Sequence, residues 1–303
     1  MEQVLEGLPS GARVAVVRLR SLGDCVLTTP ALEILKQSRP DLKTGVVVEE
    51  RFAAVFEGNP DIDALLRPGL GALREWLPDL CLNFHGGTRS LFLTVFSGAP
   101  LRAGFAHHRA SVAYNLPIPT AQEILAVDRK VHTAEHLASA IFHLGAGRRE
   151  IPRAKLFAER RPADRPYAVI HPLAAGHGKT WPAAGFLAVA GHLERVLDLE
   201  PVFIGGSGED LSAFQVYRTV AGAPLAEIKS LLAGASLFVG NDSGPAHMAA
   251  AFGLPVLVIF GASDPVTWGP WKTVSQVVVA RDSIESVAVA EVLGALERLR
   301  VTA

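Results

Sequence analysis

The sequence has little cysteine, little net charge and no long apolar run, and each shortage argues against a class of protein. Cys25 and Cys81 are its only two cysteines, too few for a disulfide framework, and both stand among apolar residues as small buried thiols do. A net charge of -1 supplies no general basic field for nucleic acid. No apolar stretch approaches the roughly eighteen residues of a membrane span, and the N-terminus does not read as a secretory signal. We therefore expect a cytoplasmic protein that does not bind nucleic acid.

Apolar residues are abundant instead, at 49% of the chain against 19% charged. Short β-branched runs alternate with longer helical patterns, which is typical of parallel sheets built from βαβ units and buried on both faces. In the first half, the expected strands are residues 13 to 19, 44 to 50 and 80 to 84, and the expected helices are 31 to 37, 70 to 77, 90 to 96 and 135 to 144.

A polar, proline-containing stretch at residues 149 to 166, REIPRAKLFAERRPADRP, interrupts this alternation and predicts a domain boundary. Beyond it, the expected strands are 167 to 171, 201 to 206, 236 to 240 and 255 to 261, with helices at 185 to 197, after 209, at 246 to 252 and at 286 to 299. We therefore expect two doubly wound α/β domains, 1–158 and 159–303, with ligands at the carboxyl ends of their strands. The sequence does not decide on which domain the last helix packs.

The loop after the first strand reads RLRSLGDCVLTTP and carries Asp24. Asp24 is suited to cap a helix. Pro30 is comfortable in a first helical turn, so the regular helix is expected to start near Thr29. That start would leave Asp24 in a loop, where it is freer to act as a base.

A second loop, IHPLAAGHGKTWP, places Lys179 just before a helix. A lysine near the positive end of a helix is electrostatically misplaced unless an anion lies there, although a solvated surface lysine is an equally good interpretation. His171 is interpreted as a buried imidazole with a hydrogen-bond partner.

A third loop, FIGGSGEDLSAF, ends a strand with glycines, and Glu209 and Asp210 are expected to open a helix. Its glycine spacing does not match the dinucleotide fingerprint G-x-G-x-x-G. Acidic residues are usual in a first helical turn, and Glu209 is equally suited to accept hydrogen bonds from a ribose.

The fourth loop, FVGNDSGPAH, holds Asn241, Asp242, Ser243 and Gly244 between a strand and a helix. An N-cap for the following helix would need only Asp242 or Ser243, so capping alone does not account for both residues and the small Gly244. The N–H groups of the following turn are expected to have no partners of their own, and helix starts of this kind bind phosphates.

Three weaker patterns leave alternatives open. His132 and His136 are four residues apart, but no third ligand such as an HExxH pattern accompanies them, which argues against zinc. The FAHHRAS stretch, with His107, His108 and Arg109, either contacts an anionic acceptor or is solvated. Trp268 and Trp271 either pack beneath their loop or line a pocket.

Four segments in order resemble the ADP-heptose:lipopolysaccharide heptosyltransferases of glycosyltransferase family 9. They are VVRLRSLGDCVLTTPALEILKQSRPD, DLCLNFHGGTRSLFLTVFSGAPLRAGF, VIHPLAAGHGKTWP and GNDSGPAHMAAAFGLPVLVIFGASDP, and together they extend the resemblance over almost the whole chain. The resemblance implies a GT-B architecture of two Rossmann-like domains facing across a cleft, with the acceptor bound by the first and the donor nucleotide by the second.

The resemblance also implies a role for particular residues. Asp24 would be the general base of an inverting transfer, and Lys179 would contact the donor's phosphates. The sequence shows no pair of carboxylates suited to bind magnesium, so we expect transfer without a metal. The other implied donor contacts are Glu209, Asp242, Ser243, Gly244 and His247, and the implied acceptor contacts are Ser21, Gly23, His85 and Arg89. No cofactor is implied beyond the co-substrate ADP-heptose.

The chain departs from the family pattern before Lys179, where residues 174 to 178 read AAGHG and offer few side-chain donors, and at FHGG, residues 84 to 87. Two other functions stay open, a GT-B nucleotide-sugar epimerase and a catalytically silent nucleotide-sugar binding protein. A glycolipid acceptor in the inner membrane would place the enzyme at the cytoplasmic face, in peripheral contact with the bilayer. The sequence leaves the oligomeric state open.

Overall fold

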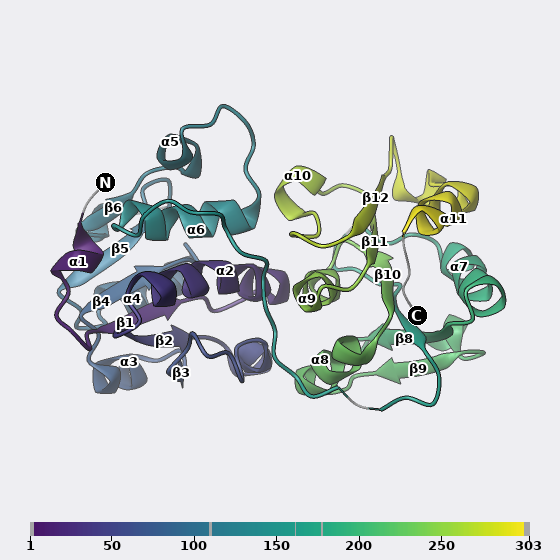
Figure 1. The fold of residues 1–303 in the computed structure, drawn as a ribbon, viewed down its shortest axis with the longest axis horizontal. Helices are drawn as coiled ribbons and strands as arrows, with labels where there is room; N and C mark the ends of the chain where they lie inside the picture. The colour runs from purple at the N-terminus through teal and green to yellow at the C-terminus, as the bar shows by residue number, and fades with distance from the viewer. Residues whose placement is uncertain (1–2, 109–110, 161, 177, 300–303) are drawn as a thin grey trace. The chain divides into compact units, whose positions relative to one another are not determined.

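A computed structural model describes residues 3–108, 111–160, 162–176 and 178–299. The chain divides into two compact units, Met1–Phe157 and Ala158–Ala303. Each unit is a parallel six-stranded sheet covered by helices, and Figure 1 labels most of the helices and strands of both.

The N-terminal unit has the strand order β3-β2-β1-β4-β5-β6, with every neighbouring pair parallel. Its strands are β1 (Arg13–Val17), β2 (Lys43–Val47), β3 (Ala64–Leu66), β4 (Leu80–Asn83), β5 (Leu101–Phe105) and β6 (Leu116–Ile118). Its helices are α1 (Val4–Gly7), α2 (Leu22–Ser38), η1 (Glu50–Val55), α3 (Leu70–Trp76), α4 (Thr88–Val95), η2 (Ser111–Ala113), α5 (Ala121–Leu125) and α6 (Thr133–His143).

The sequence pattern found β1, β2 and β4 of this unit and missed β3, β5 and β6. The two edge strands, β3 and β6, are three residues long and are too short to show a period. Strand β5 reads LRAGF, in which Arg102 and Gly104 interrupt the apolar run. Gly104 is required there, because a Cβ atom would lie 2.4 Å from the ring of Tyr114.

The C-terminal unit has the strand order β12-β11-β10-β7-β8-β9, again parallel throughout. Its strands are β7 (Tyr167–His171), β8 (Glu200–Gly205), β9 (Arg218–Ala221), β10 (Leu237–Asn241), β11 (Val256–Phe260) and β12 (Ser275–Val279). Its helices are α7 (Ala183–Val196), η3 (Ser212–Phe214), α8 (Leu225–Gly234), α9 (Gly244–Phe252), α10 (Pro265–Trp268), η4 (Ile284–Ser286) and α11 (Val289–Arg298).

The helix expected after Glu209 is wrong. Only the three-residue 3₁₀ turn η3 forms there, and the chain then enters strand β9 before helix α8 begins at Leu225. Glu209 and Asp210 fold back on their own loop instead, because Glu209 accepts a hydrogen bond from the N–H of Gly206 and Asp210 from that of Ser212. Such local bonds compete with a helical start.

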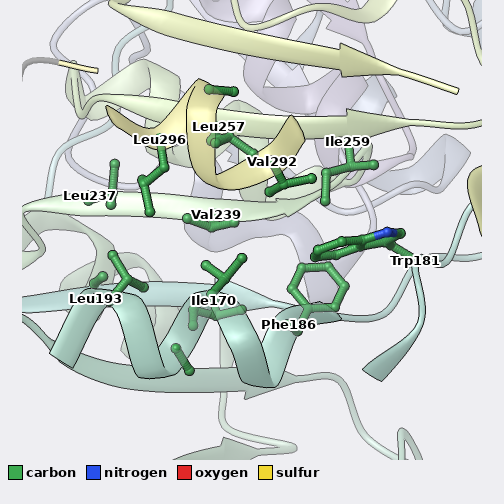
Figure 2. Close-up of a cluster of buried hydrophobic side chains, with 14 of the residues drawn as sticks. Ile170, Trp181, Phe186, Leu193, Leu237, Val239, Leu257, Ile259, Val292 and Leu296 are labelled. Carbon is green, nitrogen blue, oxygen red and sulfur yellow. The ribbon is translucent and has the colours of Figure 1, made fainter. Parts of the chain in front are cut away.

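Strands β7, β10 and β11 form the centre of the C-terminal core, and every residue of the three is buried. They are apolar except at the ends of β7 and β10, where His171 and Asn241 stand. Figure 2 shows one face of this sheet, on which Leu237, Val239 and Leu257 meet Leu193 of α7 and Leu296 of α11. The last helix therefore packs within the C-terminal unit, on α7 and β12.

Trp181 closes the end of this core nearest the candidate site. Its indole N–H donates to the carbonyl of Val287 at 2.9 Å, and its ring meets Phe186 edge-on. Gly185 leaves room for the indole, because a Cβ atom would lie 2.5 Å from it. Trp181, two residues after Lys179, thus anchors the loop of Lys179 in the core.

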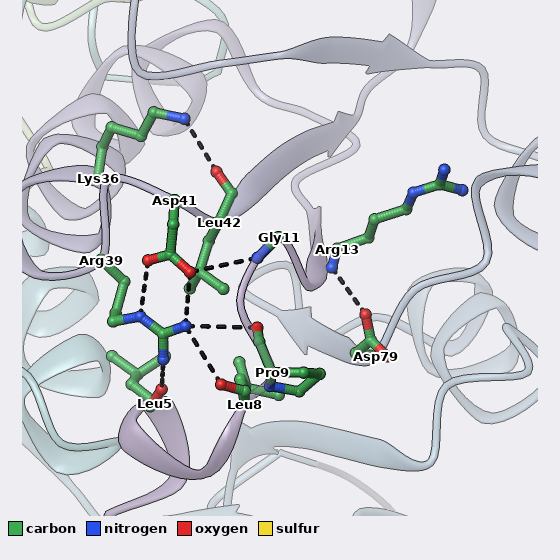
Figure 3. Close-up of polar contacts among 10 residues, drawn as sticks. All are labelled: Leu5, Leu8, Pro9, Gly11, Arg13, Lys36, Arg39, Asp41, Leu42 and Asp79. Atoms are coloured by element: carbon green, nitrogen blue, oxygen red, sulfur yellow. Dashed lines mark hydrogen bonds and ion pairs between the residues drawn. The ribbon is translucent and has the colours of Figure 1, made fainter.

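A polar cluster fixes the start of the chain to the N-terminal unit (Figure 3). Arg39 pairs with Asp41 and donates to the carbonyls of Leu5, Leu8 and Pro9. This pairing with Arg39 lowers the pKa of the Asp41 carboxyl. The cluster lies at the end of α2 away from Asp24, so it supports the helix rather than the chemistry.

Candidate active site

Asp24 lies in the first turn of α2, which begins at Leu22 rather than near Thr29 as the sequence suggested. Ser21 is the N-cap residue, and one oxygen of Asp24, Oδ2, accepts hydrogen bonds from the Ser21 hydroxyl at 2.8 Å and the Ser21 N–H at 3.4 Å. This reciprocal capping box explains the early start. Gly23 is buried in the same turn.

Pro30 stands inside the helix, where it cannot donate to the carbonyl of Val26 four residues earlier. The Thr29 hydroxyl donates to that carbonyl instead, at 2.9 Å. A neighbouring side chain therefore supplies the bond that proline removes, which is why the helix runs through Pro30 and the expected start was wrong.

The second oxygen of Asp24, Oδ1, lies 3.4 Å from Nη1 of Arg18 at the end of β1. The Arg18 side chain is only 6% exposed, and its Nε has no partner among the described residues. Burial lowers the pKa of this guanidinium. Burial also raises the pKa of the Cys25 thiol to about 12, so this neighbouring cysteine stays protonated at neutral pH.

Asp24 and Arg18 line a pocket of about 530 Å³ within the N-terminal unit. The other lining residues are Arg20, Ser21, Arg51, Phe52 and His85. Three arginines face a single carboxylate, so the pocket is a basic one that suits an anionic group. Of these arginines, only Arg18 contacts Asp24 within the described chain.

Of the other expected acceptor residues, His85 lines this pocket and its Nδ1 lies 3.0 Å from the Arg20 carbonyl oxygen. Burial, with the charge of Arg18, lowers the pKa of His85. Arg89 is not among the lining residues, but it pairs with Glu49 at 3.4 Å, and Glu49 pairs with Arg51 at 2.8 Å. Arg89 thus touches the pocket only through Glu49.

A histidine cluster adjoins this pocket and was not foreseen as a group. Phe105 stacks on His136 of α6 at 3.9 Å, and His107 and His108 lie against the same ring at 5.5 Å. Burial is the main reason that the pKa values of His108 and His136 both fall to about 4. The sequence spread these rings over two segments, so only the fold brings them together. Arg109 lies outside the described residues.

In the C-terminal unit, Lys179 and Asp242 form an ion pair, with Nζ 3.2 Å from Oδ2. The Ser263 hydroxyl donates to the same carboxylate oxygen at 2.5 Å. Lys179 comes from the loop after β7, Asp242 from the end of β10, and Ser263 from the loop after β11. Three neighbouring strands of the sheet therefore deliver these groups to one point.

Asn241 fixes the Lys179 loop, a role that the sequence did not indicate. Its fully buried amide accepts from the Trp181 N–H at 3.1 Å and donates to the Pro172 carbonyl at 2.8 Å, so it holds both ends of the loop. Gly261 lets the loop approach β11, because a Cβ atom there would lie 1.9 Å from the Gly178 carbonyl oxygen. His177 lies outside the described residues.

The start of α9 presents fewer free donors than expected. Pro245 has no N–H, and the N–H of Ala246 donates to the Ser243 carbonyl at 3.2 Å. Within the described chain, the N–H groups of Ser243 and Gly244 donate to no other residue. Neither Asp242 nor Ser243 caps the helix with its side chain, so these two N–H groups stay available for an anion.

Ser243 instead belongs to a polar chain with His171 and Glu209. The ring Nδ1 of His171 lies 3.0 Å from the Ser243 hydroxyl, and its Nε2 lies 3.7 Å from a carboxylate oxygen of Glu209. His171 is buried and partnered, in agreement with its interpretation from the sequence. The contact with His171 lowers the pKa of the Glu209 carboxyl.

His247 is buried in α9 and meets the Trp268 ring at 6.4 Å, so at least one of the two loop tryptophans packs toward this helix. In the part of the chain that the structure describes, no three His, Cys, Asp or Glu side chains gather as metal ligands. No described helix is both long enough and apolar enough to cross a bilayer.

Two doubly wound units of this kind are the GT-B fold, which the chain shares with solved heptosyltransferase structures. The chain belongs to glycosyltransferase family 9 (heptosyltransferase), which residues 71–291 match. The matched residues include Lys179 and Asp242, whereas Asp24 precedes them.

Three individual proteins illustrate the similarity. Lipopolysaccharide heptosyltransferase 3 of Escherichia coli is 28% identical over 293 residues, which is 84% of this chain and 85% of that protein. The crystal structure of the glycosyltransferase family 9 protein of Veillonella parvula aligns with a TM-score of 0.81 at 22% identity, covering 95% and 97% of the two chains. The E. coli heptosyltransferase WaaC with ADP aligns with a TM-score of 0.78 at 21% identity, covering 94% and 99%.

Proposed function

We propose that this protein is an inverting glycosyltransferase that transfers a heptose from ADP-heptose to a lipopolysaccharide-core or similar surface-glycan acceptor. The proposed substrates follow the names of the similar proteins, which include lipopolysaccharide heptosyltransferases and an ADP-bound heptosyltransferase. In this proposal the acceptor binds the N-terminal unit and the donor binds the C-terminal one.

The observation that carries the proposal is the position of Asp24. Its Oδ2 is held by Ser21, while its Oδ1 faces Arg18 in the basic pocket. A carboxylate fixed by one oxygen and presented by the other is suited to accept the proton of a bound hydroxyl. The acceptor oxygen would attack the anomeric carbon from the face opposite the leaving group, and its proton would pass to Asp24.

As the new glycosidic bond forms, the bond from the anomeric carbon to the diphosphate breaks, and ADP gains negative charge. Lys179 and the N–H groups of Ser243 and Gly244 are suited to take up that charge. This arrangement supplies the cation and the dipoles that a divalent metal would otherwise provide, so we propose that transfer is independent of metal. Glu209 and His247 complete the proposed donor contacts.

The test is Asp24→Asn, with Asp128→Asn, an exposed residue of the same unit, as the control. Transfer from ADP-heptose should fall by about 10²- to 10⁴-fold in Asp24→Asn, and ADP binding measured by calorimetry should not change. The control should match the wild type in both measurements. Full activity of Asp24→Asn would refute the base assignment.

The wild-type protein separates the alternatives. ADP binding without transfer to any acceptor would favour a silent binding protein, and conversion of a UDP-sugar without an acceptor would favour an epimerase. Transfer that persists in excess EDTA is expected from the proposal, and transfer that stops would contradict its metal independence.

A further inference from the structure

Helix α4 has its polar and apolar side chains in an unusual arrangement. Ser90 and Thr94 point inward and are fully buried, whereas Phe92 and Phe96 are 51% and 47% exposed. The buried hydroxyls are satisfied by the helix itself, since Ser90 donates to the Gly87 carbonyl and Thr94 to the Ser90 carbonyl. A helix that faces only water would have the opposite pattern.

The two phenylalanines form one apolar feature rather than two scattered ones. They are one helical turn apart, and their ring centroids lie 4.7 Å from each other. Among the described residues they are the only phenylalanine, tyrosine or tryptophan side chains in the exposed class. Exposed, contiguous aromatic surface marks a site of interaction.

The surroundings of the rings are basic. Arg74 of α3 donates through Nε to the Phe96 carbonyl at 3.4 Å, and Arg89 precedes Phe92 by one turn with 59% of its side chain exposed. Residues 80 to 108 contain no aspartate or glutamate, but they contain Arg89 and Arg102. Glu49 pairs with Arg89, and Glu75 follows Arg74 on α3.

We propose that Phe92 and Phe96, flanked by Arg74 and Arg89, dock the N-terminal unit on the surface of an anionic lipid bilayer. Aromatic rings enter the boundary between head groups and acyl chains, and arginines are attracted to anionic head groups. We name these four residues the α4 face. The reason for such docking rests on the proposed function, in which the acceptor is a glycolipid.

The α4 face is continuous with the basic pocket. Arg89 pairs with Glu49, Glu49 pairs with Arg51, and Arg51 lines the pocket that holds Asp24. Phe96 lies seven positions after Arg89, which is about 10 Å along the helix axis. A glycolipid whose lipid lies beside the phenylalanines would therefore extend its sugars toward Asp24.

A bilayer fits this surface better than a second protein chain. Two half-exposed phenylalanine rings offer roughly 200 Å² of apolar area, since a phenylalanine buries about 150 to 250 Å² in full. A stable protein interface needs about 800 Å² from each partner. Attachment to a membrane surface has no such minimum area, because its strength is the sum of the apolar area that enters the bilayer and the attraction between cations and anionic lipids.

The experiment is cosedimentation of the full chain with vesicles of phosphatidylcholine alone, or with about one-third phosphatidylglycerol. The wild type should bind the anionic vesicles and be weakened by high salt. The double variant Phe92→Ser and Phe96→Ser should bind them at least about tenfold more weakly. The matched control, Val196→Ser with Val216→Ser, alters exposed apolar residues of the other unit and should bind like the wild type.

A second variant, Phe96→Trp, tests the contact without removing apolar surface. Brominated lipids should quench its added fluorescence when vesicles bind, and they should leave the signal of the wild type unchanged. An absence of both vesicle binding and quenching would overturn the proposal. So would a dimer, seen by sedimentation velocity, that the double serine variant dissociates while no vesicle binding occurs.

These readouts are independent of catalysis. The double serine variant should retain ADP binding and transfer to a lipid-free acceptor, and should lose transfer to the same acceptor embedded in vesicles. Failure of the proposed function would abolish both transfers in the wild type and leave vesicle binding intact, so the two failures are distinguishable.

Discussion

Lys179 and Asp242 are joined by a 3.2 Å ion pair, although 63 residues separate them in the sequence. The pair resolves the electrostatic question that Lys179 raised, because the carboxylate offsets a cation placed just before a helix. It also leaves Lys179 31% exposed, so the ammonium group retains donors for a ligand.

Replacing Lys179 tests this arrangement. Lys179→Gln should weaken ADP binding by about 10- to 100-fold, because a charge-assisted contact to phosphate is lost. Titration calorimetry measures the change, with Arg195→Gln at the C-terminal end of α7 as the charge-matched control. Equal ADP affinity of Lys179→Gln and the wild type would remove Lys179 from the donor site.

Gly261 provides a purely steric test of the same loop. The Gly178 carbonyl occupies the place of a Cβ atom, so Gly261→Ala should displace the loop and separate Lys179 from Asp242. We expect a loss of about 1 to 3 kcal/mol of stability and weaker ADP binding. Thermal unfolding and calorimetry measure the two effects.

Gly294→Ala is the control for this substitution, since its nearest neighbour lies at 3.7 Å within helix α11. It should leave ADP binding unchanged and stabilise the helix slightly. If Gly261→Ala leaves ADP binding and stability unchanged, the close approach of Gly178 to Gly261 does not position the loop of Lys179.

Thr29 and Pro30 form a third testable unit. The buried Thr29 hydroxyl donates to the Val26 carbonyl and accepts from the Lys155 N–H at 3.1 Å. Thr29→Val leaves the Val26 carbonyl and the Lys155 N–H without this partner. It should lower the free energy of unfolding by about 2 to 4 kcal/mol. Pro30→Ala restores a backbone N–H that can donate to the Val26 carbonyl.

Thr29→Val should therefore cost less in the background of Pro30→Ala, by about 1 kcal/mol. Urea unfolding of the four proteins in a double-mutant cycle measures this coupling. Strictly additive effects would show that the hydroxyl does not compensate for proline.

These residues also show what the sequence could and could not predict. Buried strands such as β7 and β11 were predicted because their apolar runs are continuous, and Asp24, Lys179 and Asp242 became candidates because they follow strands. The start of α2 was mispredicted because the compensation at Pro30 is a side-chain bond that propensity does not contain. The histidine cluster and the bonds of Asn241 were missed because they depend on contacts between distant segments.

The last prediction concerns pH and the histidine cluster. The folded-state pKa values of His108 and His136 are about 4, against 6.5 for an unperturbed histidine. The unfolded chain therefore binds protons that the folded unit does not, from pH 6.5 downward. The stability of the N-terminal unit should be complete above pH 6.5 and should decrease until about pH 4.

Between pH 6.5 and 5 the loss should be about 2 kcal/mol for the pair, after an allowance for their partial exposure. Hydrogen exchange of α6, corrected for its intrinsic pH dependence, measures the loss in this unit. His136→Gln should reduce the pH dependence by about half, because glutamine does not titrate and one buried imidazole remains. His192→Gln, in the C-terminal unit, should leave the exchange of α6 unchanged. A pH profile of α6 that is the same in His136→Gln and the wild type would show that desolvation of this ring does not govern the acid sensitivity of the unit.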